Sequence, residues 1–213
     1  QARMKDGQRA FKGDIIAEIS GNARSILKGE RTALNFFQRM SGIATMTSKY
    51  VSEISGLKTR IVDTRKTAPG LRILDKYSVK AGGGFNHRFN LSDMVLIKDN
   101  HIKAAGGITP AVAAARAKGS HGLKIEVEVE SIRELIEAIE AGADIVMLDN
   151  MTLDMMKEAV SIASGKVLLE ASGNITIRGE RSVRAVAETG VDIISAGALT
   201  NSVKAMDISL RFL

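Results

Sequence analysis

Four short apolar stretches in the second part of this 213-residue chain end in a polar residue at nearly even intervals. The end residues are Glu128, Asp149, Ser172 and Ser195, which lie 21, 23 and 23 positions apart. Helical patterns follow these stretches, and strands that alternate with helices in this way form parallel βαβ units. The active site of such a fold lies where the carboxyl ends of the strands meet. The spacing therefore predicts an α/β barrel or sheet with these four residues at one rim.

Six segments fit the strand pattern: 58–63, 94–98, 124–130, 144–149, 167–171 and 192–195. The clearest predicted helix is 131–141, where Ser131 and Glu134 form a capping box and Gly142 supplies a stop. Another helix is predicted to open with Thr109 as its cap and Pro110 in its first turn. A third covers roughly 178–189.

The first part of the chain has a different pattern. Segment 12–21 is predicted to be a turn, a short strand and another turn, and 30–54 a long helix with a weak point at Gly42. We therefore expect two domains, 1–42 and 43–213. Residues 200–213 are expected to pack back on the first domain.

The formal net charge of +6 has three readings: an ordinary basic surface, nucleic-acid binding, or a site for small polyanions. Aromatic residues make up only 4% of the chain, which disfavours base stacking. Cysteine is absent, which excludes thiolate metal sites and fits a cytoplasmic location. The sequence has no apolar run long enough to span a membrane.

Segment 124–130 alternates between apolar and acidic residues. Glu126, Glu128 and Glu130 share one face of the predicted strand, and the apolar residues between them share the other. Parallel strands are usually covered on both faces, which favours a functional role for Glu128 at the rim over a solvated surface. Glu126 is left open, and Glu130 is expected at the rim or in solvent. Asp149 is also left open between a site residue and a helix cap.

Basic residues gather in three other segments. Arg65, Lys66 and Arg72 follow the first strand, Lys98 ends the second, and Arg88 closes the glycine-rich loop 82–88 after His87. Arginine is suited to carboxylates and phosphates, although a solvated basic loop is the alternative for 63–72. Glycines allow close backbone approach, but this loop has no P-loop spacing. No metal-ligand spacing joins the three histidines.

Small residues follow the last two strands, Ser172-Gly173 and Ser195-Ala196-Gly197. They expose backbone N–H groups ahead of helical sequence, where anions are favoured. The alternatives are a phosphate-binding cup or simply tight strand-to-helix turns.

Taken in order, these pieces resemble the quinolinate phosphoribosyltransferase family, also called carboxylating nicotinate-nucleotide pyrophosphorylases. The resemblance is carried by segments 30–35, 63–72, 82–88, 96–101, 126–128, 148–150 and 170–173. It implies an incomplete, open α/β barrel of the type II phosphoribosyltransferase kind, joined to part of an N-terminal α/β sandwich domain. The family barrel is usually described with seven strands, one more than the sequence shows. The family usually carries further residues before residue 1, which complete the sandwich, and its active sites are shared across a homodimer or higher homo-oligomer.

The resemblance also implies an activity: phosphoribosyl transfer from phosphoribosyl pyrophosphate to quinolinate, which yields nicotinate mononucleotide, pyrophosphate and CO₂ in NAD biosynthesis. It implies that Mg²⁺ is the cofactor and that nucleic acid and membranes are not partners. The implied quinolinate-binding residues are Arg31, Arg65, His87, Arg88 and Lys98, with Arg31 serving the partner subunit's site. Lys66 and Lys98 would contact the pyrophosphate, and Glu128 and Asp149 would hold the ribose hydroxyls and Mg²⁺. The 5′-phosphate cup would be formed by Ser172, Gly173, Ser195 and Gly197.

One departure from the family pattern is Asn174, where a second glycine is common, although Asn tolerates the left-handed backbone region. The nearest alternatives are a nicotinate phosphoribosyltransferase and a molybdenum-transport-associated relative of the same fold. Segment 12–21 also resembles a turn of biotinyl or lipoyl carrier domains. Nucleic-acid binding is a third alternative.

Overall fold

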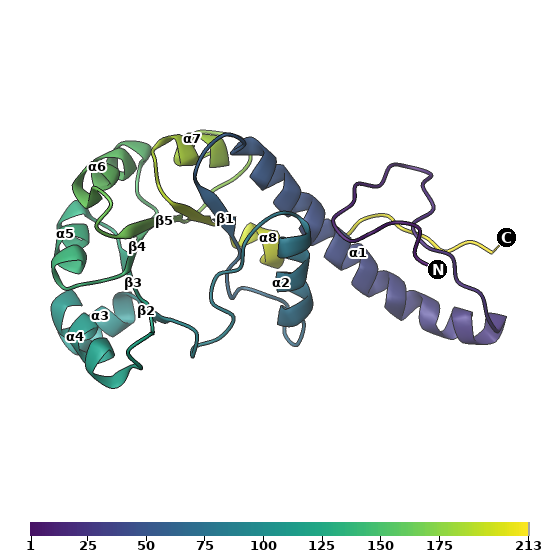
Figure 1. The fold of residues 1–213 in the computed structure, drawn as a ribbon, viewed down its shortest axis with the longest axis horizontal. Helices are drawn as coiled ribbons and strands as arrows, with labels where there is room; N and C mark the ends of the chain where they lie inside the picture. The colour runs from purple at the N-terminus through teal and green to yellow at the C-terminus, as the bar shows by residue number, and fades with distance from the viewer. Residues whose placement is uncertain (213) are drawn as a thin grey trace.

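A computed structural model describes residues 1–212. Its centre is a parallel sheet, and the described residues contribute six strands in the order β1-β6-β5-β4-β3-β2. Their bounds are β1 Arg60–Val62, β2 Val95–Ile97, β3 Ile125–Val129, β4 Ile145–Asp149, β5 Leu168–Ser172 and β6 Ile193–Ser195. Five strands lie within the predicted segments and β5 runs one residue past its segment, to Ser172, which confirms the α/β class. The sheet curls, and the helices from α3 to α7 cover its outer side (Figure 1).

A seventh position in the sheet is held by a single residue. Phe85 forms a parallel bridge with Val62 on the outer edge of β1. Its N–H donates to the Ile61 carbonyl at 2.8 Å, and its carbonyl accepts from the Asp63 N–H at 3.2 Å. The chain enters this bridge from the turn at Gly82–Gly84 and leaves it at once. The barrel is therefore open between this segment and β2.

The helices of the barrel are α2 Arg72–Ala81, α3 Asp99–Ala105, α4 Ile108–Lys118, α5 Ile132–Glu140, α6 Leu153–Ala163, α7 Val183–Glu188 and α8 Ala198–Asn201. The core lies between the outer helices and the strand residues that face them. Val127, Val146 and Leu148 are among these residues, and all three are fully buried. Strand alternation leaves the other face of each strand for the barrel interior.

One predicted capping box and two predicted helix starts need correction. Ser131 caps α5 through the Glu134 N–H, but the Glu134 carboxylate accepts from the Glu130 N–H, so the capping box is only half formed. Thr109 lies inside α4, and both its N–H and its hydroxyl donate to Glu137 of α5. α7 begins only after Ser182, because the preceding residues form a turn.

Helix α1, Ala23–Glu53, is longer than predicted. It begins before residue 30 because the Asn22 side chain accepts from the Ser25 N–H at 3.2 Å. It also runs through Gly42 without a break. The predicted domain boundary therefore falls inside a continuous helix, and the division into 1–42 and 43–213 stays a prediction. None of the helices in residues 1–212 is long and apolar enough to cross a membrane.

The first residues of the chain and the last residues that the structure describes lie beside the part of α1 that projects from the barrel (Figure 1). The Gln38 amide donates to the Ile208 carbonyl at 2.7 Å, and the Met206 N–H donates to the Gln38 carbonyl at 3.0 Å. Segment 12–21 forms only an isolated bridge, between Ala17 and Ala2. The C-terminal segment thus packs against α1.

Gly42 is explained by this packing, because a Cβ atom there would lie 2.3 Å from the Lys204 carbonyl oxygen. We expect Gly42→Ala to lower the free energy of unfolding by about 1–3 kcal/mol, as overpacking does. Gly29→Ala is the matched control, because Gly29 is exposed in the same helix with nothing within 4 Å of such a Cβ. It should instead stabilise the protein by up to about 1 kcal/mol. Urea unfolding would measure both changes, and equal effects would contradict this packing role.

Candidate active site

The interior face of β3 carries acids, as the alternation predicted. Glu126 is fully buried, Glu128 is partly buried and Glu130 is exposed. The apolar residues between them, Val127 and Val129, are buried against the helices. Glu126, which the sequence left open, is thus an interior residue and not part of a solvated face.

Lys98 and Glu128 meet at the rim between β2 and β3. Ile97 pairs with Val127 in the sheet, which brings the next residues of both strands together. Lys98 Nζ donates to Glu128 Oε2 at 2.8 Å, and the side chains are 47% and 17% exposed. Ion pairs open to solvent contribute little net stability, so either group can exchange its partner for a ligand at small cost.

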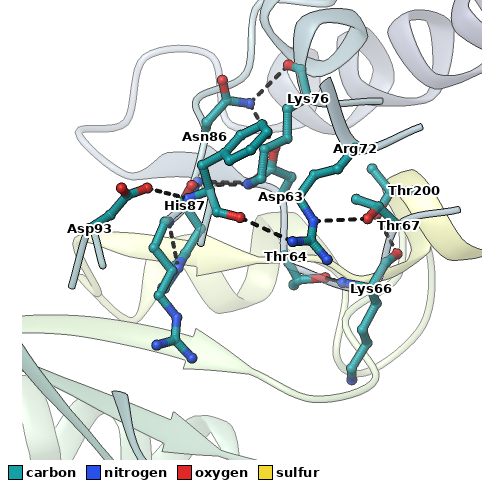
Figure 2. Close-up of polar contacts among 12 residues, drawn as sticks. Asp63, Thr64, Lys66, Thr67, Arg72, Lys76, Asn86, His87, Asp93 and Thr200 are labelled. Atoms are coloured by element: carbon teal, nitrogen blue, oxygen red, sulfur yellow. Dashed lines mark hydrogen bonds and ion pairs between the residues drawn. The ribbon is translucent and has the colours of Figure 1, made fainter. Parts of the chain in front are cut away.

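The loop after α2 is fastened by the buried carboxylate of Asp63, which follows β1 (Figure 2). This carboxylate accepts from the His87 N–H at 2.9 Å and from the Asn86 amide at 2.6 Å, and it pairs with the Lys76 ammonium. Lys76 Nζ also donates to the His87 carbonyl at 2.9 Å. Burial raises the pKa of Asp63, while the Lys76 ammonium opposes that rise.

The glycines of loop 82–88 permit close packing on α1. A Cβ atom at Gly82 would lie 2.4 Å from the Ala44 carbonyl oxygen, and one at Gly84 would lie 2.7 Å from Thr47 Cγ2. The close approach that these glycines allow is therefore made to a helix of the same chain.

His87 lies against two buried acids inside the barrel. Its Nε2 is 3.0 Å from Glu126 Oε2 and 3.4 Å from Glu170 Oε2. Burial raises the pKa of Glu126 to about 7, and the charge of Glu170 adds to the rise. Burial alone would lower the pKa of His87, but hydrogen bonds to the two carboxylates raise it above its ordinary value. Glu126 therefore retains its proton at pH values where an ordinary carboxyl group has already lost it.

The position of the His87 ring proton follows from its other nitrogen. The Arg88 N–H donates to His87 Nδ1 at 2.9 Å, so Nδ1 accepts and the ring proton lies on Nε2. A further proton is favoured on Glu126, whose pKa is raised to about 7. The ligand atoms of these three residues lie within 4.8 Å of one another, as metal ligands do. However, a metal would need the Nε2 lone pair, so the geometry favours a proton-sharing group.

Arg65 and Arg88 form the cationic side of the site. Burial and the charge of Arg65 both lower the pKa of Arg88. Arg88 Nη1 donates to the Met94 carbonyl at 3.1 Å, and the buried Nε of Arg65 has no partner within the described residues. Two neighbouring guanidinium groups with unused donors are suited to an anion that carries two negative charges.

The predicted phosphate-binding residues gather at the ends of β5 and β6. Gly173 has a φ of +93° and Asn174 a φ of +49°, which confirms that Asn174 adopts the left-handed region. A Cβ atom at Gly197 would lie 3.4 Å from Lys66 Cδ, so Lys66 adjoins this end of the site. The Ser195 hydroxyl is buried and has no hydrogen-bond partner within residues 1–212.

Asp149 stands next to this cup. It pairs with Ser172 in the sheet, and its Oδ2 accepts from the Asn150 amide at 2.8 Å. Thr152 caps α6, so the alternative in which Asp149 caps the following helix is wrong. Asp149 and Glu128 offer carboxylate oxygens on neighbouring strands, which is the donor chemistry that Mg²⁺ prefers.

One predicted residue lies apart. Arg31 belongs to the first third of α1, which projects from the barrel (Figure 1), and it is exposed. Three residues of the site were missed: Asp63, Lys76 and Glu170. Glu170 shares a strand face with Ser172, two positions later, so the alternation used for β3 would have found it. No sequence signal pointed to the buried pair of Asp63 and Lys76.

The fold and the site define an α/β-barrel enzyme that binds anionic substrates at the carboxyl ends of its strands. Two family models match the chain: the quinolinate phosphoribosyl transferase C-terminal domain over residues 43–211 and the N-terminal domain over residues 1–41. The chain therefore belongs to the quinolinate phosphoribosyltransferase family.

Individual relatives agree with this assignment. The probable carboxylating nicotinate-nucleotide pyrophosphorylase of Bacillus subtilis is 50% identical over 206 residues, which cover 97% of this chain and 70% of the relative. The solved nicotinate-nucleotide pyrophosphorylase of Francisella tularensis is 51% identical with a TM-score of 0.91, over 97% of this chain and 72% of that one. The NadC structure from Streptococcus pyogenes is 45% identical with a TM-score of 0.90, over the same shares.

Lys76→Met tests the fastening of the loop, because it leaves the Asp63 carboxylate buried without its cation. We expect the free energy of unfolding to fall by about 3–5 kcal/mol. Lys80→Met is the control, since Lys80 is exposed on the same helix and should change stability by no more than about 0.5 kcal/mol. Urea denaturation followed by circular dichroism compares the variants. If the Lys76→Met and Lys80→Met proteins unfolded at the same urea concentration, the burial of the Asp63 carboxylate would not depend on Lys76.

Proposed function

We propose that this chain transfers the phosphoribosyl group of phosphoribosyl pyrophosphate to quinolinate and releases pyrophosphate and CO₂. The observation that carries the proposal is the meeting of cations and acids from distant segments at one rim. Arg65 and Arg88 lie together on one side, and Lys98 pairs with Glu128 on the other. This arrangement fits a dicarboxylate that must react with a sugar phosphate.

Electrostatics explain why the site is rich in cations. Both substrates are strongly anionic, so bringing them together costs repulsion that buried positive charges offset. Arg65 and Arg88 bind the two quinolinate carboxylates through their free donors. Lys66 and Lys98 contact the pyrophosphate, for which Lys98 exchanges its ion pair with Glu128.

Glu128 and Asp149 act on the ribose. As the pyrophosphate leaves, positive charge develops on the ribose ring, and Glu128 and Asp149 stabilise it. Glu128 and Asp149 would help to hold Mg²⁺, which would neutralise the pyrophosphate and so favour its departure. The quinolinate nitrogen forms the new bond to the anomeric carbon. The nitrogen then carries a positive charge, so the adjacent carboxylate leaves as CO₂. Its bonding electrons stay on the ring carbon, which takes up a proton from water to complete nicotinate mononucleotide.

The 5′-phosphate is held by the ends of β5 and β6. Ser172, Gly173, Ser195 and Gly197 present hydroxyl and N–H groups that can surround a phosphate. His87 has both ring nitrogens engaged by protein groups. Its part in carboxylate binding therefore includes holding the backbone of Arg88.

The proposal extends to a homodimer in a cytoplasmic setting. Arg31 lies outside the barrel of its own chain, so it takes part in binding only if it reaches the partner subunit. Shared sites of this kind would bring a cationic side chain to the open side of the barrel.

Arg88→Ala removes one of the two guanidinium groups next to the buried acids. We expect kcat/KM for quinolinate to fall at least about 30-fold, the usual cost of truncating a buried charge contact. The KM for phosphoribosyl pyrophosphate should change much less. Arg133→Ala serves as the control, because Arg133 is exposed on the outer helix α5. Parallel assays with quinolinate and nicotinate complete the test, and a preference for nicotinate would contradict the proposed function.

Glu128→Gln keeps the shape of the side chain but removes its charge. If the carboxylate stabilises the charge that develops on the ribose, kcat should fall about 100-fold while both KM values change little. Steady-state kinetics with each substrate varied in turn would measure this. A rise confined to KM would assign Glu128 to ground-state binding.

A further inference from the structure

Three backbone carbonyls at the ends of β4 and β5 converge on one guanidinium group, that of Arg181. Its Nη2 donates to the Gly173 carbonyl at 2.9 Å and to the Ser172 carbonyl at 3.2 Å, and its Nη1 donates to the Met151 carbonyl. The buried Nε has no partner within residues 1–212, so these carbonyls alone offset the desolvation of the group. Arg181 therefore joins the loops that follow two neighbouring strands.

These contacts fix which way the next N–H groups point. In a trans peptide the C=O and the following N–H point in opposite directions. The Ser172 carbonyl also accepts from the Asn150 N–H of the β4 side at 3.1 Å. The Gly173 N–H therefore points away from β4, towards the side of β6 where Gly197 lies. Neither the Gly173 nor the Asn174 N–H donates to a backbone carbonyl within residues 1–212.

The loop needs support to keep this conformation. Gly173 and Asn174 both have left-handed backbones, which cost of order 1–3 kcal/mol for a residue other than glycine. A Cβ atom at Gly173 would lie 2.1 Å from Asn150 Oδ1, so the loop also passes close to its neighbour. A planar guanidinium presents donors in a fixed fork that can hold several carbonyls at once, whereas a lysine ammonium is a compact point charge.

We propose that Arg181 is a positioning residue for sugar-phosphate binding: it turns the carbonyls of Ser172 and Gly173 away from the cup so that the following N–H groups face the 5′-phosphate. The inference rests on the proposed function, because it takes the ends of β5 and β6 as the phosphate cup. Arg181 itself does not touch the substrate.

The test is calorimetry with two probes: phosphoribosyl pyrophosphate with Mg²⁺, and phthalate, a dicarboxylate without a reactive nitrogen. For Arg181→Gln we expect the Kd of phosphoribosyl pyrophosphate to rise about 10- to 100-fold, as loss of hydrogen bonds to a charged group does. The Kd of phthalate should stay within about threefold. Arg181→Lys should show an intermediate loss. Arg184→Gln is the control, because Arg184 is exposed on the same segment and pairs with Glu188 on the surface.

Each outcome has a distinct meaning. A wild-type protein that does not bind phosphoribosyl pyrophosphate would overturn the proposed function. A wild-type protein that binds it, with unchanged affinity in Arg181→Gln, would overturn only the role of Arg181. Equal losses for both probes, or loss of folding in both Arg181 variants by circular dichroism, would make Arg181 a residue of general stability and would also overturn that role. Selective loss for the sugar phosphate supports it.

Discussion

The cationic side of the active site depends on one buried carboxylate. Asp63 follows the edge strand β1, and it accepts from Lys76 of α2 and from the backbone of His87 (Figure 2). A buried carboxylate is costly unless donors surround it, so these contacts hold the loop closely. His87 in turn accepts from the Arg88 N–H. The position of the Arg88 guanidinium therefore depends, through His87, on Asp63, a residue that touches no substrate.

The interior of the barrel separates charges by strand. The acids come from the central strands β3 to β5: Glu126, Glu128, Asp149 and Glu170. Arg65 and Arg88 come from loops next to the edge strand β1. When Glu126 is ionised, its charge opposes the fall in pKa that burial and Arg65 cause at Arg88. The substrates bring negative charge to the cationic edge, and the reaction brings positive charge to the acidic strands. The arginines therefore lie where the anionic substrates bind, and the acids lie where positive charge develops on the ribose.

Periodic features of the sequence predicted most of the barrel. Strand alternation and even spacing located all six strands and the rim residues Glu128 and Asp149, because buried parallel strands need both a regular period and short turns. Contacts between distant segments have no such period. This is why the pair of Asp63 and Lys76 and the carbonyl-binding Arg181 were missed. Gly42 was misread for the same reason: its lack of a side chain makes room for the Lys204 backbone, 162 positions later.

The continuity of α1 has a mechanical consequence. A 31-residue helix is about 46 Å long, and this one has no glycine or proline kink where the two domains were expected to meet. Such a helix moves as one rigid element, so a displacement at one end is transmitted to the other. The reach of the distal end, Arg31 included, is then set by helical pitch, so inserting or deleting a single residue in α1 would swing everything beyond it by about 100° around the axis.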